Sequence, residues 1–324
     1  MRCSSPTLDS TEYAFQIQLE DTSFVSLLNV LQLYAKFSSA LNWTAVGSNQ
    51  TGVILIPKTT NPIAQMKTDL DRVEREREFH DKRFADDTVR HQKLDRYYEA
   101  SDTLFAKYKS RILENPAGAK VLEYGVGTGG CAFALAERGA FVTGIDISGT
   151  AIEIAKREAP KRGVQVEFRL MNAEQLDFGD NSLDMICGTG ILHHLDLQKA
   201  LPEIKCVLKP GGKAFFLEPM GHNPLIRLYR SLTPTLRSVD EHPLLMEDLR
   251  FICSHFQKSR TEHFGLLLIC AAFTGRFRRS ARLRGLLEAI DRRLFVVRFL
   301  RRQAWLVLLE LENPVKIENA GGEA

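Results

Sequence analysis

The feature that most constrains the fold of this chain is a turn with three glycines on alternate positions. An apolar segment, Val121–Tyr124, leads into Gly125, Gly127 and Gly129. A side chain at these positions would collide with a closely bound ligand, so glycine lets the backbone approach it. The helix-like residues 131–137 follow, and their first N–H groups would point toward the same place. The pattern predicts the front half of a nucleotide-type site in an α/β protein.

Two ligand classes fit this turn. Gly125, Gly127 and Gly130 satisfy G-x-G-x-x-G, the spacing of dinucleotide sites. Glu123 and the three alternate glycines instead give E-x-G-x-G-x-G. The turn alone therefore leaves both classes open.

An acidic residue at the end of the next strand-like segment does not separate the two classes. Asp146 closes residues 141–146 and lies about 20 residues past the first glycine, where doubly wound folds hold ribose hydroxyls. NAD and S-adenosylmethionine (SAM) both carry that ribose. Beyond it, Ser148 and Thr150 are expected to cap a helix through Arg157, with Thr150 and Glu153 at capping-box spacing.

The motifs that follow favour one class. The order of five pieces resembles that of class I SAM-dependent methyltransferases, in particular the type 11 family related to the quinone-biosynthesis methyltransferases. The pieces are the glycine turn, Asp146, the loop Asn172–Phe178, the run Ile191–Leu195 with its Leu-His-His, and Lys209–Gly212. The resemblance covers residues 120–219 and implies SAM as the cofactor.

The resemblance also implies a fold. It is a Rossmann-like sheet of seven mostly parallel strands, with the last strand antiparallel and helices on both faces. Helices ahead of the sheet would form a lid over SAM and the acceptor. We expect the last two strands at Phe264–Ala271 and Ala304–Leu311, which are apolar segments.

Site residues follow from the same resemblance. The turn would hold the methionine part of SAM, Asp146 the ribose, Ile147 and the Asn172 loop the adenine, and Thr189 would lie near the methyl group. Asn172 departs from the aspartate common in the family, although an amide oxygen can still accept a hydrogen bond. The implied cofactor residues are Glu123, Gly125, Gly127, Gly129, Asp146, Ile147, Asn172, Ala173 and Thr189.

The pair His193 and His194 supplies the candidates for catalysis. Imidazole titrates near neutral pH and can act as a base toward an acceptor hydroxyl or carbon acid. The alternative is that the pair orients its loop and takes no part in proton transfer.

The composition of the chain limits the classes of partner that it can be expected to bind. A net charge of +3 is too small to indicate nucleic acid, and the six cysteines show no metal-binding spacing. No stretch has the roughly 20 apolar residues of a membrane span, and the first residues lack the pattern of a secretory signal. We expect a cytoplasmic enzyme that methylates an oxygen or a carbon of a small-molecule acceptor, with a hydrophobic or lipid-like compound as one option. We expect no metal and no nucleic acid, and the sequence leaves the oligomeric state open.

The chain divides into four expected parts. Residues 1–65 are an extension, 66–118 a helical lid, 119–312 the SAM-binding domain and 313–324 a tail. Gly47–Pro62 is rich in turn formers, and 24–37 could form one amphipathic helix. The charged run within 66–84 is interpreted as a helix whose charges face solvent.

A basic amphipathic segment, 276–302, interrupts the domain. Ten arginines accompany leucines, isoleucine and valine at helical spacing. Such a segment can lie on an anionic membrane, hold an acidic substrate, or cover the sheet with a solvated face.

For the whole chain, the alternatives to an enzyme of this family are a SAM-binding protein without turnover and an NAD(P)-dependent reductase.

Overall fold

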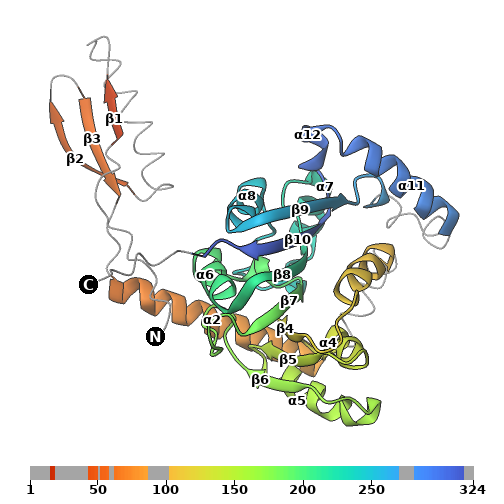
Figure 1. Ribbon diagram of the computed structural model, residues 1–324. Coiled ribbons are helices and arrows are strands. Elements are labelled where there is room, and N and C mark those ends of the chain that lie inside the picture. Colours follow the sequence, from red (N-terminus) through yellow and green to blue (C-terminus); the bar gives the residue numbers. More distant parts are fainter. Residues whose placement is uncertain are drawn as a thin grey trace, which may run out of the picture. The chain divides into compact units, whose positions relative to one another are not determined.

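The computed structural model describes residues 15–18, 43–49, 52–57, 62–86, 102–269 and 281–316 (Figure 1). The chain forms two compact units, a small one within residues 4–71 and a large one from Arg72 onward.

The small unit contains a three-stranded antiparallel sheet in the order β1-β3-β2. Its strands are β1 Phe15–Gln18, β2 Trp43–Asn49 and β3 Gly52–Pro57. Much of the Gly47–Pro62 stretch is therefore strand, and its interpretation as turn-rich is wrong there: Asn49 pairs with Gly52 across neighbouring strands. The helix suggested for residues 24–37 lies outside the described residues.

Helix α2, Pro62–Ala85, begins before Met66, with proline at its first position. Proline is favoured there because the first helical N–H has no partner within the helix. The charged run expected within 66–84 is indeed one helix.

The large unit is built on a seven-stranded sheet in the order β6-β5-β4-β7-β8-β10-β9. Strands β4 to β8 are parallel, and β10 runs antiparallel to both of its neighbours. This confirms the expected Rossmann-like sheet. The strands are β4 Lys120–Tyr124, β5 Phe141–Asp146, β6 Glu167–Leu170, β7 Leu183–Thr189, β8 Leu208–Pro219, β9 Phe256–Phe264 and β10 Leu306–Pro314.

Helices cover both faces of this sheet. Residues 102–112, α4 Gly130–Ala136 and α5 Gly149–Glu158 pack on one face, and α6 Leu197–Val207 and α8 Met246–Ser254 on the other. Consecutive strand residues such as Val121 and Leu122 enter opposite cores, because side chains alternate along a strand. The short 3₁₀ turns are Pro160–Arg162, Leu192–His194 and Pro234–Leu236.

The penultimate strand lies earlier than expected. Phe264–Ala271 was predicted as a strand, but the strand is β9, which ends at Phe264. Its sequence, FQKSRTEHF, is polar because β9 is an edge strand and most of its side chains are exposed or half-buried. The prediction of a last strand at Ala304–Leu311 is confirmed by β10.

The basic segment forms two helices in its described part, α11 Ala281–Leu294 and α12 Arg298–Arg301. The buried carboxylate of Asp291 fastens α11 to the loop after β9 by accepting N–H bonds from Leu266, Leu267 and Leu268. Burial raises the pKa of this carboxyl group.

Apolar side chains remain exposed around α12 and on α7, Pro224–Leu232. On the first they are Val296, Val297 and Phe299, and on the second Leu225, Leu228 and Leu232. The two helices are connected, since the Asn223 side chain that caps α7 donates to the carbonyl of Gln303, 2.7 Å away. Within the described part of the chain, no helix has the length and apolar character needed to cross a bilayer.

Candidate functional site

A cavity of about 250 Å³ lies at the carboxyl ends of β4, β5 and β7. Residues of α2 form its opposite wall. A wider hollow, of about 1380 Å³, lies at the amino ends of neighbouring strands. Open α/β sheets bind ligands at the carboxyl ends of their strands, so the smaller cavity is the candidate site.

The glycine turn forms one edge of this cavity. Gly125 and Gly127 have φ angles of 72° and 51°, in the region that favours glycine. A Cβ atom on Gly125 would lie 2.9 Å from Cδ1 of Ile191, and one on Gly127 would lie 3.4 Å from the ring of Phe84. Both positions therefore favour a residue without a side chain, and the close approach of the backbone to a ligand stays a prediction.

The carboxylate of Asp146 connects this turn with the next. Its Oδ2 accepts the N–H of Gly127 and its Oδ1 accepts the N–H of Ser148, both at 2.8 Å. Ser148 caps α5 by accepting from the N–H of Ala151, as expected. The capping box predicted for Thr150 and Glu153 is wrong, because the N–H of Thr150 donates to Asp81 of α2 instead.

Glu123 is almost fully buried beneath the turn. Its Oε2 accepts the N–H of Ala132 in the first turn of α4, 2.5 Å away. Burial raises the pKa of Glu123 to about 8. The side chain is therefore largely protonated at neutral pH, unless a cation binds beside it.

Most of the other predicted residues also border the cavity. They are Ile147, Asn172, Ala173, Thr189 and His194, whereas Gly129 and His193 do not line it. The side-chain oxygen of Asn172 accepts the N–H of Glu174, so it shapes its own loop.

Helix α2, part of the lid predicted within residues 66–118, forms one wall of the cavity, but none of its lining residues was predicted from the sequence. Arg72, Glu76, His80, Arg83 and Phe84 of α2 line it. The interpretation of the charged run as a solvated face is wrong for this side of the helix, because Glu76 is only 4% exposed. The spacing of residues 72, 76, 80 and 83 places them on one face, and this was the available signal.

Ion pairs hold that face of α2 against the sheet domain. The guanidinium of Arg72 reaches both carboxylate oxygens of Glu174 at 2.6 Å and the carbonyl of His194 at 3.1 Å. Arg75 makes two 2.8 Å bonds to Asp240. The Arg75 pair joins two guanidinium nitrogens to two carboxylate oxygens, and such a bidentate pair fixes orientation as well as distance.

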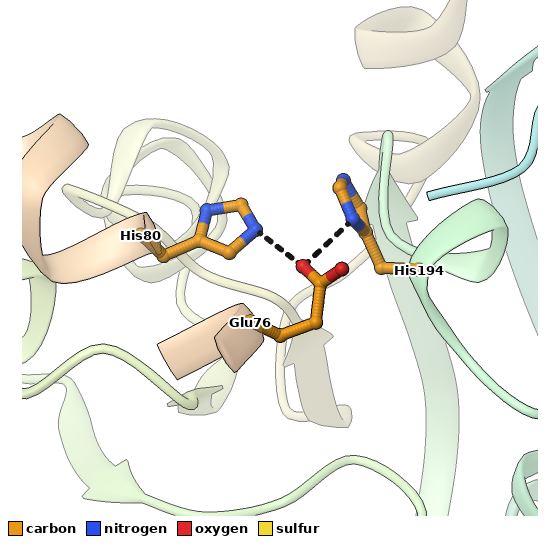
Figure 2. Close-up of side chains that lie close together, drawn as sticks. All are labelled: Glu76, His80 and His194. Carbon is orange, nitrogen blue, oxygen red and sulfur yellow. Dashed lines mark ion pairs between the residues drawn. The ribbon is translucent and has the colours of Figure 1, made fainter. Parts of the chain in front are cut away.

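A cluster of one carboxylate and two imidazoles lies where α2 meets the Leu-His-His loop (Figure 2). Oε2 of Glu76 is 3.1 Å from Nδ1 of His194 and 3.4 Å from Nε2 of His80. Burial alone would raise the pKa of Glu76, but the two imidazoles and the Ser238 hydroxyl hold it well below its usual range. Burial lowers the pKa of both histidines, which favours their neutral forms.

The neighbouring His193 side chain contacts Glu218 and not the Glu76 cluster. Its Nδ1 lies 2.9 Å from Glu218, whose other oxygen accepts the N–H groups of Ile191 and Leu192. Burial raises the pKa of Glu218 to about 7 and lowers that of His193 to about 3. These contacts fix the shape of the Leu-His-His loop and turn His194 toward the cavity.

Residues 122–216 match the family model described as a methyltransferase domain. Residues 122–216 therefore form a methyltransferase domain. The match agrees with the expected methyltransferase family and with SAM as its cofactor. The assignment of the glycine turn to SAM stays a prediction.

Curated relatives share that domain. The chain is 34% identical over 137 residues to demethylmenaquinone methyltransferase of Chlorobaculum parvum, covering 41% of this chain and 54% of that one. It is 35% identical over 100 residues to the ubiquinone biosynthesis O-methyltransferase of Coxiella burnetii, covering 31% and 43%. The chain spans about half the length of the first curated relatives it matches.

A solved structure agrees with the fold. Phosphoethanolamine N-methyltransferase 2 of Haemonchus contortus superposes with a TM-score of 0.52 at 16% identity, over 93% of this chain and 77% of that one. At this identity the likeness concerns the fold alone.

The raised pKa of Glu123 predicts how stability depends on pH. The unfolded chain loses this proton near the ordinary value of 4.5, whereas the folded chain keeps it to about pH 8. Between these values folding takes up a proton, so the free energy of unfolding falls as pH rises. Glu123→Gln should match wild type near pH 5 and be several kcal/mol more stable at pH 9, since each pKa unit is worth about 1.4 kcal/mol.

Urea unfolding at a series of pH values measures this difference. Glu137→Gln, at an exposed position directly after α4, is the control and should show no trend. The prediction is contradicted if the free energies of unfolding of wild type and Glu123→Gln differ by the same amount at every pH from 5 to 9.

Proposed function

We propose that this chain transfers the methyl group of SAM to a small, apolar, quinone-like acceptor. The observation that carries the proposal is the Asp146 carboxylate, which lies on the cavity and is oriented by the N–H groups of Gly127 and Ser148. Held in this way, it can accept hydrogen bonds from both ribose hydroxyls of SAM. Glu123 would lie near the ammonium, Asn172 and Ala173 near the adenine, and Thr189 near the methyl group.

Methyl transfer makes modest demands on the protein. The methyl carbon of SAM is bonded to a positively charged sulfur, which leaves as a neutral thioether. The enzyme must align nucleophile, methyl carbon and sulfur and exclude water. The wall that α2 places over the cavity supports the proposed exclusion of water, because Arg72 and Arg75 hold that helix in position.

The methyl acceptor is proposed to bind in the part of the cavity next to His194. A neutral imidazole there presents a nitrogen that can accept a proton from an acceptor hydroxyl. His193 does not border the cavity and is bonded to Glu218, so we assign it the positioning role. Relatives named for menaquinone and ubiquinone biosynthesis support an apolar ring compound as acceptor.

Asp146→Asn should weaken SAM binding by roughly 1–3 kcal/mol, the scale of a hydrogen bond to a charged acceptor. The substitution keeps one oxygen for the turn but removes the charge that favours both ribose hydroxyls. Titration calorimetry with SAM measures the change, and NADH in place of SAM tests for a reductase.

Asp184→Asn is the matched control for this variant. Asp184 also accepts a backbone N–H, that of Lys120, but at the amino ends of the strands. SAM affinity should be unchanged in this control. Equal affinities in wild type and folded Asp146→Asn would remove Asp146 from the site, and saturable binding of NADH alone would reject the methyltransferase.

We also propose that the surface around α12 rests on anionic membranes, where apolar acceptors dissolve. Val296 and Phe299 are 73% and 65% exposed, and they lie among exposed Arg292, Arg293 and Arg298. Apolar side chains within a basic face suit the boundary between lipid headgroups and acyl chains.

A double variant, Val296→Ser with Phe299→Ser, should bind anionic vesicles about tenfold more weakly, because fewer apolar groups enter the lipid. Co-sedimentation with phosphatidylserine-containing vesicles at several salt concentrations measures it. Phe141→Ser with Leu170→Ser is the control, since these side chains are 68% and 58% exposed on β5 and β6. If both double variants sediment with vesicles as wild type does, the proposed membrane contact is rejected, and the arginines form a face exposed to solvent.

A further inference from the structure

We infer that Glu76, His80 and His194 form the binding site of one divalent transition-metal ion. Figure 2 shows the carboxylate of Glu76 between the two imidazoles, one from the same face of α2 and one from the Leu-His-His loop. Glu76 and His80 are one helical turn apart, so both side chains reach the same point. The three ligand atoms lie within 4.8 Å of one another.

The two separations measured from Glu76 fit a shared ion. Nitrogen and oxygen ligands lie about 2.0–2.2 Å from such ions, which places two ligand atoms roughly 3.0–3.4 Å apart at the usual coordination angles. The measured separations from Oε2 of Glu76 are 3.1 Å to His194 and 3.4 Å to His80.

Unsatisfied atoms provide the second, independent observation. Oε2 of Glu76 and Nδ1 of His194 are buried, yet neither makes a hydrogen bond of acceptable geometry. A buried polar atom without a partner costs about 1–3 kcal/mol. Ligands of one ion have this arrangement, since their lone pairs point at the ion and not at each other.

Contacts outside the cluster would hold the ligands in place. The other carboxylate oxygen of Glu76 accepts from the hydroxyl of Ser238. Hydrogen bonds to ligating carboxylates and imidazoles orient them in known metal sites.

A second cluster fits an ion less well. Glu241 lies 3.9 Å and 3.8 Å from His193 and His194, and its carboxylate is already paired with Arg230 and Arg237. Two cations beside this carboxylate disfavour a third. The Glu76 cluster is therefore the one that we assign.

The donor set selects the class of ion. Two imidazoles and a carboxylate suit zinc, iron(II) or manganese more than magnesium or calcium, which prefer oxygen ligands. Three protein ligands leave positions free, and all three residues border the cavity that also contains Asp146 and Thr189. A further step rests on the proposed methyl transfer. With Nδ1 of His194 bound to the ion, the ion would take the place of this imidazole by binding an acceptor oxygen and lowering the pKa of its hydroxyl group.

Cobalt(II) tests the site directly, because its visible absorption reports coordination without any need for turnover. The full chain, stripped with a chelator, should bind one Co²⁺ with the absorption of a nitrogen- and oxygen-ligated ion. Glu76→Gln and His80→Asn should each weaken binding at least tenfold. The controls are Glu74→Gln, an exposed position on α2, and His255→Asn, beyond the end of α8; both should bind as wild type does.

Two results would overturn the assignment: no saturable Co²⁺ absorption in wild type, or equal binding in all four variants. If Glu76→Gln fails to melt cooperatively, His80→Asn decides, because the His80 side chain is less buried. SAM calorimetry on the same samples separates the two proposals. SAM binding without cobalt binding rejects the metal site alone, and cobalt binding without SAM binding rejects the proposed function alone.

Discussion

The hydrogen bonds of the Asp146 carboxylate connect the parts of this site. One oxygen holds the glycine turn after β4 and the other holds the first turn of α5 after β5. The two strands are neighbours and parallel, so their carboxyl ends meet at one edge, and a single side chain can fix both turns. The closeness of the backbone to the cavity at Gly125 and Gly127 follows from this arrangement.

Helix α2 completes the cavity, and electrostatic contacts place it there. Arg72 and Arg75 pair with acidic residues of later loops, and Asp81 accepts from the hydroxyl of Ser148, the residue that caps α5. The same face carries Glu76 and His80 to the Leu-His-His loop. A helix held by such pairs brings its own carboxylate and imidazole into a buried place, which apolar packing alone would not do.

The sheet domain could be predicted from sequence because each of its motifs is local. The glycine turn, the acid after β5 and the Leu-His-His run each act through neighbours in the chain. Their order carried the family resemblance, which implied a mostly parallel sheet of seven strands with the last one antiparallel. The failures have a common cause. Edge strand β9 is polar because of its place in the sheet, and Glu76 is buried because of partners more than 100 residues away, which spacing along the chain does not reveal.

Methyl transfer is the central claim, and labelled SAM tests it most directly. Wild-type protein with SAM carrying a labelled methyl group should transfer label to reduced quinones or their hydroxylated precursors, extractable into organic solvent, and release S-adenosylhomocysteine in equal amount. Asp146→Asn should lower the rate at SAM concentrations that saturate neither protein. Saturable SAM binding with no transfer to any acceptor in a lipid-soluble extract would contradict the account and indicate a SAM-binding protein without turnover.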